Sequence, residues 1–421
     1  MNVHCRRNFW RHLLLVVVGA MGWICLAVVF SSNARVENME IKFTNDSARV
    51  QDYLISPSGM DARLERIHNV CKEWSVPGKV SIITVYPPRH TAYCINHKVA
   101  STYWLQVFRY LYNDTTRDVH RPSDISKFET HLSQFRYVEF LNFYNLTIQR
   151  DLTRNYFRFM ITREPYKRLW SVYIDKFVLV DGWFWDLFAP EIRTRYLATF
   201  GNGETLENTK CLKDISFKEF IHYVSEIGSK SPENLNDHMI PVHYTCNPCH
   251  YKPTFVGNLE TMTDEKPIIL DRLGLSRIDS ATNFTDHVLN EITTIADFEF
   301  DSVLAHKYQR RCLTDAELET RIIRAFVFNG YFREDVFTEV EQLLPLGRDR
   351  FVPVLMEIFT NSNITPSESS SLRKRFMLEA YSHIPLSMLK NLKITYTFDF
   401  LLFGYNPEPP DIFAHTKTDS T

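Results

Sequence analysis

The chain has 421 residues, of which 44% are hydrophobic, 14% aromatic and 23% charged, a composition typical of a folded protein rather than a disordered or fibrous one. Its 48 lysines and arginines against 50 acidic residues give a formal net charge of -2, so no global basic excess indicates a nucleic-acid partner and any polyanion site must be local. The length allows roughly two or three domains, or one α/β domain with insertions.

A candidate membrane segment lies near the N-terminus. Residues 13–30, LLLVVVGAMGWICLAVVF, contain no charged side chain and are long enough to cross a bilayer as one helix. Three arginines lie in residues 1–12, and this charge bias predicts a cytosolic tail there and a luminal position for the rest of the chain. A cleaved signal peptide ending in the small residues 31–34 is the alternative, but the long apolar stretch favours an uncleaved signal-anchor.

The luminal part is predicted to contain a stem, one catalytic domain and a tail. Residues 31–75 carry few periodic apolar positions and indicate a spacer. The catalytic domain is expected over residues 76–405, with a polar, turn-rich break at residues 361–371 and a helix over residues 372–392. Residues 406–421 lack the apolar content to fold by themselves, so we expect a loose C-terminal tail.

Two strand–loop–helix units follow each other in the predicted domain. Residues 79–85 and 91–95 are short runs rich in β-branched and aromatic side chains, as strands are, and residues 102–112 have apolar side chains at helical spacing. The second unit has a strand over 157–162 and a helix that carries Pro165 in its first turn. Repeated units of this kind indicate an α/β sheet.

The loop between the predicted strand at 91–95 and the helix at 102–112 has the composition of an anion site. Lys98 and the hydroxyls of Ser101 and Thr102 lie together near the predicted helix start. The free N–H groups and the positive end of a helix favour phosphate or sulfate, and a lysine adds a mobile positive charge. An ordinary surface turn capped by one of the hydroxyls is the alternative. No Gly-x-x-x-x-Gly-Lys-Ser/Thr motif occurs, so a nucleoside-triphosphatase loop is absent.

The second loop supplies residues for another phosphate. Arg163 follows the strand at 157–162, and Ser171 lies two turns into the next helix. The alternatives are an ion pair of Arg163 with Glu164 or another acid, and a solvated helix position for Ser171.

The cysteines and the glycosylation motifs fit a secreted or luminal chain. In an oxidising lumen the six cysteines beyond the membrane segment can close three disulfides, and the sequence does not choose among their pairings: Cys71, Cys94, Cys211, Cys246, Cys249 and Cys312. Cys246-x-x-Cys249-His250 is also compatible with a zinc or haem site. Five Asn-x-Ser/Thr motifs are candidate glycosylation sites: Asn45, Asn113, Asn145, Asn283 and Asn363.

The two loops and several later motifs resemble those of Golgi carbohydrate sulfotransferases. Lys98-Val-Ala-Ser-Thr-x-Trp and Arg163-Glu-Pro-Tyr-x-Arg-Leu-x-Ser-x-Tyr-x-x-Lys-Phe match the two cofactor motifs of that family, best in its chondroitin, dermatan and HNK-1 branch, sulfotransferase family 2. Further matches lie at residues 238–241, 246–249, 255–257, 260–261 and 399–405. The resemblance covers about residues 93–405 but is interrupted at 274–375, where we expect an insertion. In the first motif, His97 replaces a usual proline and Tyr103 a common asparagine.

The resemblance implies a fold and a reaction. The fold would be α/β, a parallel sheet flanked by helices with a phosphosulfate-binding core like that of P-loop kinases. The reaction would transfer the sulfuryl group of 3'-phosphoadenosine 5'-phosphosulfate to a glycosaminoglycan hydroxyl without a metal, with galactosamine O-4 of chondroitin as the expected acceptor. The family also implies a single-pass type II protein of the Golgi membrane with a luminal catalytic domain.

The motifs also imply roles for individual residues. Lys98 would lie at the bridging oxygen, where negative charge develops as the phosphate leaves. The phosphosulfate would be held by Lys98, Val99, Ala100, Ser101 and Thr102, and the 3'-phosphate by Arg163 and Ser171.

A sugar hydroxyl also needs a base to accept its proton, and His238, which lies in a family motif, is the candidate. The alternative is a packed, structural His238, with His243, Asp237 or Glu260 as the base. A local basic groove would be required for an anionic glycan, with these candidate lining residues: Arg117, His120, Arg121, Lys167, Arg168, Arg193 and Arg195.

Two other functions stay open at this point. One is a uronosyl 2-O-sulfotransferase acting on heparan or dermatan, whose first motif also uses Ala-Ser-Thr. The other is a catalytically silent glycan-binding relative, which His97 and the unmatched segment 274–375 suggest. A metal-dependent glycosyltransferase is disfavoured because no Asp-x-Asp occurs in the chain.

Overall fold

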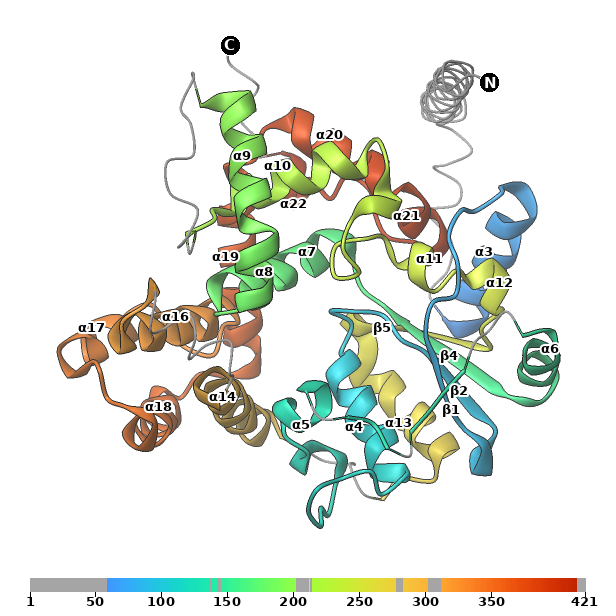
Figure 1. Cartoon of the computed structure of the whole chain (residues 1–421), viewed down its shortest axis with the longest axis horizontal. Helices are drawn as coiled ribbons and strands as arrows, with labels where there is room; N and C mark the ends of the chain where they lie inside the picture. Colours follow the sequence, from blue (N-terminus) through green and yellow to red (C-terminus); the bar gives the residue numbers. More distant parts are fainter. Residues whose placement is uncertain are drawn as a thin grey trace, which may run out of the picture.

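A computed structural model describes most of the chain beyond the N-terminal segments (Figure 1). The described residues are 59–132, 134–136, 138–141, 145–201, 212, 214–277, 283–301 and 312–414. The predicted cytosolic tail at 1–12, the predicted signal-anchor at 13–30, most of the predicted stem, Asn45 and Cys211 lie outside these residues. Within the described ranges, no helix combines the length and the apolar character needed to cross a membrane.

Five strands form one mixed sheet in the order β3-β1-β2-β4-β5. Strands β2, β4 and β5 are parallel, whereas β1 is antiparallel to both β2 and β3. Their bounds are β1 Ile83–Tyr86, β2 Thr91–Cys94, β3 Glu139–Leu141, β4 Phe157–Thr162 and β5 Phe255–Asn258.

Helices surround this sheet and extend well beyond it (Figure 1). One set comprises α3 Met60–Glu73, α4 Ser101–Leu111, α5 Lys127–Leu132, α6 Leu146–Asn155, α7 Pro165–Tyr173, α11 Val242–Thr245, α12 Pro248–Tyr251 and α13 Met262–Leu273. A second set comprises α8 Gly182–Leu187, α9 Ala189–Phe200, α10 Phe217–Gly228, α20 Leu386–Thr395, α21 Thr397–Phe403 and α22 Pro410–Phe413. A third set comprises α14 Phe284–Asp301, α16 Asp315–Phe328, α17 Val336–Val340, α18 Arg348–Ser362 and α19 Pro366–Ser382. The π-helical turn η3, Ile174–Val178, continues α7, and the short 3-10 turns are η1 Pro87–Arg89, η2 Pro122–Asp124, η4 Pro232–Asn234, η5 Leu259–Thr261 and η6 Glu341–Leu343.

Side chains of the strands alternate between two buried cores, because successive residues of a strand point to opposite faces of the sheet. Tyr93, Phe159 and Phe255 belong to the core that α4 and α13 complete. Met160 and Val256 belong to the larger core, which α3, α7 and α12 share. The sheet is therefore covered by helices on both faces, as the sequence predicts.

The predicted parallel arrangement is confirmed for β2, β4 and β5 but is wrong for β1. Only residues 87–90 connect β1 to β2, and they form the turn η1 followed by His90 in the left-handed conformation, with φ 43°. A parallel crossover needs a dozen or more residues, whereas so short a connection forces a hairpin. The first strand also begins later than predicted, because the N–H groups of Lys79 and Ser81 donate to carbonyls at Tyr244 and Thr245 instead of to the sheet.

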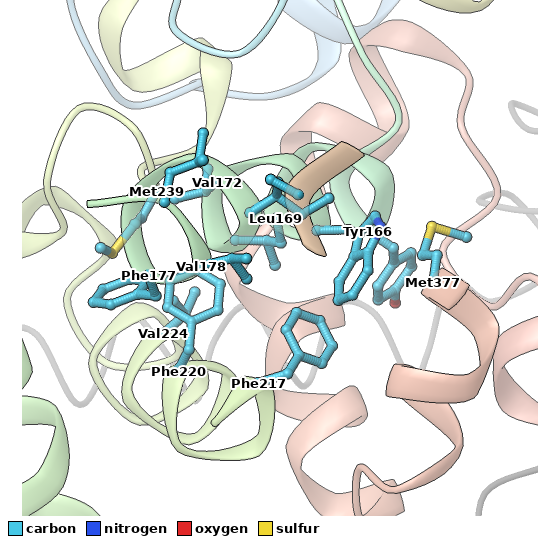
Figure 2. Close-up of a cluster of buried hydrophobic side chains, with 14 of the residues drawn as sticks. Tyr166, Leu169, Val172, Phe177, Val178, Phe217, Phe220, Val224, Met239 and Met377 are labelled. Carbon is cyan, nitrogen blue, oxygen red and sulfur yellow. The ribbon is translucent and has the colours of Figure 1, made fainter. Parts of the chain in front are cut away.

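Helix α7 is held in a largely apolar environment. Figure 2 shows Tyr166 and Leu169 of α7, Phe220 of α10 and Met377 of α19 in one buried cluster. Each apolar side chain of this size contributes roughly 1.5–3 kcal/mol when fully buried. The end of β4, and Arg163 just beyond it, are therefore attached to a well-packed helix.

The predicted stem extends too far into the chain. Helix α3 lies inside the segment 31–75 but packs against β5 and α21, and its Cys71 is bonded to Cys249. Arg63 donates to the carbonyl of Val256 at 2.8 Å and pairs with Glu265 at 2.6 Å. The folded domain therefore includes residues from about 60 on. The helix also carries apolar side chains at helical spacing, Met60, Leu64, Ile67 and Cys71, which pack in the two cores and which the prediction overlooked.

Two further boundaries differ from the prediction. Most of the polar segment 361–371 is helical, since α18 ends at Ser362 and α19 begins at Pro366 after Thr365, whose hydroxyl accepts from the Glu368 N–H. The predicted helix 372–392 is two helices, α19 and α20, with Pro385 directly before the second.

The segment predicted as a loose tail also begins later than expected. Tyr166 donates from its hydroxyl to the carbonyl of Pro407 at 2.7 Å, and Ile412 of α22 is buried. These contacts attach residues 406–414 to the domain, although their composition is too polar to fold alone.

Candidate functional site

The parallel strands bring the two predicted loops together. Since β2, β4 and β5 run in the same direction, their carboxyl ends share one edge of the sheet, where ligands bind in open α/β sheets. The loop after β2 carries Lys98, the end of β4 is followed by Arg163, and β5 is followed by Glu260.

The loop after β2 has the backbone of an anion-binding turn. Lys98 and Ala100 both adopt the left-handed conformation, with φ 64° and 63°, and α4 starts directly afterwards at Ser101. Ala100 occupies the N-cap position, where its side chain cannot accept a hydrogen bond from the first turn. N–H groups that are not capped by a side chain, at the positive end of a helix, are available to phosphate or sulfate oxygens. Left-handed non-glycine residues cost of order 1–3 kcal/mol and are concentrated at functional sites.

Two arginines of the second motif hold this loop through its carbonyl groups. Arg163 donates from Nη1 to the carbonyl oxygen of Lys98 at 3.2 Å. Arg168 donates to the carbonyls of His97 at 3.1 Å, Ile240 at 2.7 Å and Asp237 at 3.3 Å. Because Arg168 is only 1% exposed, it supports the loop and does not line a glycan groove, contrary to the prediction.

The prediction left an ion pair of Arg163 with Glu164 open. The carboxylate of Glu164 instead caps α7 by accepting from the N–H groups of Tyr166 at 3.1 Å and Lys167 at 2.8 Å. Burial raises the pKa of Glu164 to about 7, and the two capping bonds oppose that rise. Arg163 therefore does not depend on Glu164 for its position.

A cluster of charges surrounds the Lys98 ammonium group. Asp175 of η3 contacts Lys98 at 3.2 Å, Lys127 at 3.3 Å and Lys176 at 3.1 Å, and Lys176 also pairs with Asp181 at 2.7 Å. Burial lowers the pKa of Lys98 to about 8 despite the opposing charge of Asp175. Burial alone would raise the pKa of Asp175, but the three ammonium groups outweigh it and hold that pKa well below its usual range. Three cations face two carboxylates, so the cluster keeps a positive excess beside the loop.

Two stacked histidines lie next to this cluster. The ring centres of His97 and His238 are 4.1 Å apart with planes inclined by 23°, and the ring centre of Phe184 lies 5.3 Å from that of His238 with the planes at 89°. Burial, with help from Arg168, lowers the pKa of His97 to about 4. Burial, His97 and Lys176 lower the pKa of His238 further. Both rings are therefore neutral at physiological pH, and a neutral ring is the form that can accept a proton.

Two of the other candidate bases, His243 and Glu260, have hydrogen-bond partners of their own. His243 is buried, and its Nδ1 lies 2.7 Å from Asp399 Oδ1, while the N–H groups of Val242 and His243 also donate to that carboxylate. This arrangement is a structural contact of α11 with α21. Glu260 accepts from the Glu164 N–H at 3.0 Å and from the Tyr405 hydroxyl at 3.3 Å, beside Arg163.

The hydroxyl residues of the predicted donor site lie in different settings. Thr102 Oγ1 contacts His131 Nε2 at 2.9 Å, and Val99 and Ser101 are buried. Ser171 is half-buried on α7, and neither its hydroxyl nor that of Ser101 makes a hydrogen bond with the described residues. The structure thus brings Lys98, Arg163 and His238 to one place but shows no direct contact from Ser171 to them.

The segment predicted as an insertion borders the site through α14. The Lys127 ammonium lies over the Phe298 ring, 4.5 Å from its centre. Glu299 accepts from the Val180 N–H at 3.0 Å, and burial raises the pKa of Glu299 to about 7. Figure 1 shows α16, α17 and α18 beyond α14, farther from the sheet. The lobe formed by α14, α16, α17 and α18 therefore reaches the lysine cluster along one side.

The disulfides decide the role of the cysteine motif. Cys94 is bonded to Cys246, and Cys71 to Cys249. Both cysteines of Cys246-x-x-Cys249 are thus joined to distant segments, which contradicts the zinc or haem alternative. Four candidate glycosylation sites are exposed: Asn113, Asn145, Asn283 and Asn363.

The prediction missed several residues of the site. Lys127 lies in no motif, Asp175 occupies an unspecified position of the second motif, and Asn236 lies two residues before the motif that begins at His238. The motifs therefore gave these three residues no role. Lys176 lies in the Lys-Phe ending of the second motif, which was the one available indication.

Comparisons with known proteins show which family the sequence matches. A sequence model described as Sulfotransferase family matches residues 82–335. "Carbohydrate sulfotransferase 11" of Danio rerio is 27% identical over 222 residues, covering 51% of this chain and 61% of the relative. "Carbohydrate sulfotransferase 14" of Danio rerio is 25% identical over 256 residues, covering 58% of this chain and 64% of the relative. "Carbohydrate sulfotransferase 10" of Homo sapiens is 27% identical over 242 residues, covering 53% of this chain and 64% of the relative. The match thus spans less than two thirds of each of these relatives. No solved structure matches the chain.

Proposed function

Because the chain belongs to the sulfotransferase family, whose sequence model covers more than half of it, we propose that it transfers a sulfuryl group to a carbohydrate hydroxyl. The donor would be 3'-phosphoadenosine 5'-phosphosulfate, which supplies sulfur already activated by a phosphate leaving group. The observation that carries the proposal is the left-handed loop at Lys98, held by Arg163 from the second motif.

The donor site is proposed at the shared edge of β2 and β4. The N–H groups at the start of α4, the Lys98 ammonium and the hydroxyls of Ser101 and Thr102 would hold the phosphosulfate. The main chain of Val99 and Ala100 shapes the loop, and Arg163 and Ser171 would hold the 3'-phosphate. The positive excess around Asp175 supports this assignment, because it favours an anion beside Lys98.

His238 is the proposed base. Its ring is neutral, lies against His97 of the donor loop, and comes from a different segment than the donor residues. Lys98 would stabilise the oxygen that gains charge, while His238 would accept the hydroxyl proton. A base in this position contributes about 10²–10⁴-fold to the rate.

The acceptor is proposed to be a glycosaminoglycan, with galactosamine O-4 of chondroitin as the first candidate. Support comes from the motif resemblance and from relatives whose names are carbohydrate sulfotransferases. We also propose that the chain is a single-pass type II protein of the Golgi membrane, with residues 13–30 as the anchor.

The test is sulfate transfer by the purified full chain from radiolabelled donor to desulfated chondroitin, dermatan and heparan, followed by disaccharide analysis. We expect label on galactosamine O-4 with the natural chain, and a loss of at least about 100-fold with Lys98→Ala. Arg375→Ala is the matched control, since that arginine is exposed and pairs with Glu334 rather than with a residue of the loop. Label on uronic acid would instead establish the uronosyl reaction, and donor binding without transfer to any glycan would contradict the proposed activity.

A further inference from the structure

Asn236 makes two contacts to His238 through a single atom. Its Oδ1 accepts a hydrogen bond from the main-chain N–H of His238 at 3.0 Å and lies 2.9 Å from the Nδ1 atom of the same residue. Nε2 of His238 has no hydrogen-bond partner among the described residues. The ring plane is set independently by stacking on His97 and by a T-shaped contact with Phe184.

These contacts determine where the ring carries its proton. A main-chain N–H can only donate, so the side-chain atom of Asn236 that faces it must be the carbonyl oxygen and not the amide nitrogen. The same oxygen faces Nδ1, and an oxygen without a proton can only accept. Nδ1 must therefore be the protonated nitrogen, which leaves Nε2 with a free electron pair in the neutral ring.

We propose that Asn236 is a positioning residue that holds His238 in the Nδ1–H form, so that Nε2 is the atom that receives the proton of the acceptor hydroxyl. This inference rests on the proposed sulfate transfer. Nε2 takes the hydroxyl proton as the hydroxyl oxygen bonds to sulfur, and the bridging oxygen leaves with its electron pair beside Lys98. The imidazolium that forms keeps its Nδ1–H bond to Asn236 and afterwards releases the Nε2 proton to solvent.

The surroundings of His238 favour the neutral ring before the reaction. The charged and titratable groups that face it are His97 and Lys98 from the loop after β2, and Asp175 and Lys176 from η3. Burial and the cations keep its pKa below the usual range, and Asp175 opposes them. Asp175 is thus the one anion in this set that can stabilise the imidazolium.

Asn236 also has a structural role that a test must separate. Its main-chain carbonyl accepts from the N–H groups of Met239 and Ile240 at 2.7 and 2.8 Å. These bonds do not involve the side chain, so the turn can persist when the amide is removed. Asn234, exposed in η4 two residues upstream, provides a matched control.

The first experiment measures the tautomer directly. Long-range proton–nitrogen correlation spectra of the full chain, labelled at the histidine ring nitrogens, report which nitrogen is protonated, and His238→Ala assigns the signal. We expect the Nδ1–H form in the natural chain and in Asn234→Ala, and its loss in Asn236→Ala. An Nε2–H ring in the natural chain would overturn the proposal whether or not any glycan is sulfated, so this result is independent of the proposed function.

The second experiment uses kinetics. Asn236→Ala should lower kcat by about 10–100-fold with the KM for donor unchanged, and should have no further effect in a His238→Ala background. Asn236→Asp retains an acceptor for both N–H groups, so it should keep activity at neutral pH. Its carboxylate should move the acidic limb of the kcat profile to higher pH by raising the pKa of His238. If the losses of kcat caused by Asn236→Ala and His238→Ala add in the double variant, or if the kcat profile of Asn236→Asp does not move, Asn236 has only a structural role.

Discussion

Arg163 donates a hydrogen bond from Nη1 to the main-chain carbonyl oxygen of Lys98 at 3.2 Å, which joins the end of β4 to the loop after β2. The two residues are 65 positions apart in the chain. One guanidinium therefore contributes positive charge to the proposed donor site and also stabilises the left-handed backbone that aims the loop.

We expect Arg163→Ala to weaken binding of 3'-phosphoadenosine 5'-phosphate by about 10–100-fold. A hydrogen bond to a charged group contributes about 1.5–3 kcal/mol, and the loop loses its support at Lys98 as well. Titration calorimetry measures the affinity, with Arg375→Ala as the control. Arg163→Lys should recover only part of the affinity, because an ammonium group lacks the planar fork of guanidinium. Unchanged affinity in both variants would refute the assignment of Arg163.

Donor binding should depend on pH through Lys98. Its pKa in the free protein is lowered to about 8, so the Lys98 side chain is mostly charged below pH 8 and loses its charge as the pH rises through that value. A bound anion favours the charged form, and the affinity should therefore be nearly constant below about pH 7 and fall about tenfold between pH 7 and 9. Calorimetry at a series of pH values checks this, and Lys98→Arg should abolish the fall. A fall of equal size in that variant would assign it to another group.

Replacing His243 should lower the stability of the domain, whereas replacing His238 should lower kcat. Asp399→Ala leaves the N–H groups of Val242 and His243 and the His243 ring without their buried acceptor, so it should destabilise the domain by about 3–5 kcal/mol. His243→Ala should lower the melting temperature while kcat of the folded protein stays within about twofold, whereas His238→Ala should lower kcat with little effect on melting. His250→Ala, on an exposed residue, is the control. The reverse pattern would transfer the proposed role of base to His243.

The two disulfides should contribute to stability about equally but to binding unequally. Removing either pair, as Cys71→Ala with Cys249→Ala or as Cys94→Ala with Cys246→Ala, should cost about 2–5 kcal/mol, because each closes a long loop. Cys94 ends β2 directly before the donor loop, so only the second double variant should also weaken donor binding. Urea unfolding and calorimetry measure the two effects. Equal affinity in both double variants would show that this disulfide does not position the loop.

The local sequence pattern was sufficient to predict those strands and helices that interactions between near neighbours in the chain stabilise. The strand at 157–162 and Pro165 in the first turn of the following helix agree with β4 and α7. The hairpin of β1 and β2 was missed although a connection of a few residues between two strands implies it. Helix α3 was missed although Leu64, Ile67 and Cys71 lie at helical spacing, and its links to Cys249 and Glu265, far along the chain, carry no local signal.

The amino-acid sequence by itself determined the family, through ordered motifs, and it predicted the residue types of the proposed site, because a lysine, an arginine and free N–H groups near a helix start all favour a bound anion. Only the tertiary structure decided which residues act together. Asp175 meets Lys98 from the loop after β2, Lys127 from α5 and Lys176 from its own turn η3. Such contacts depend on distance and orientation across the fold, and neither is encoded in spacing along the chain.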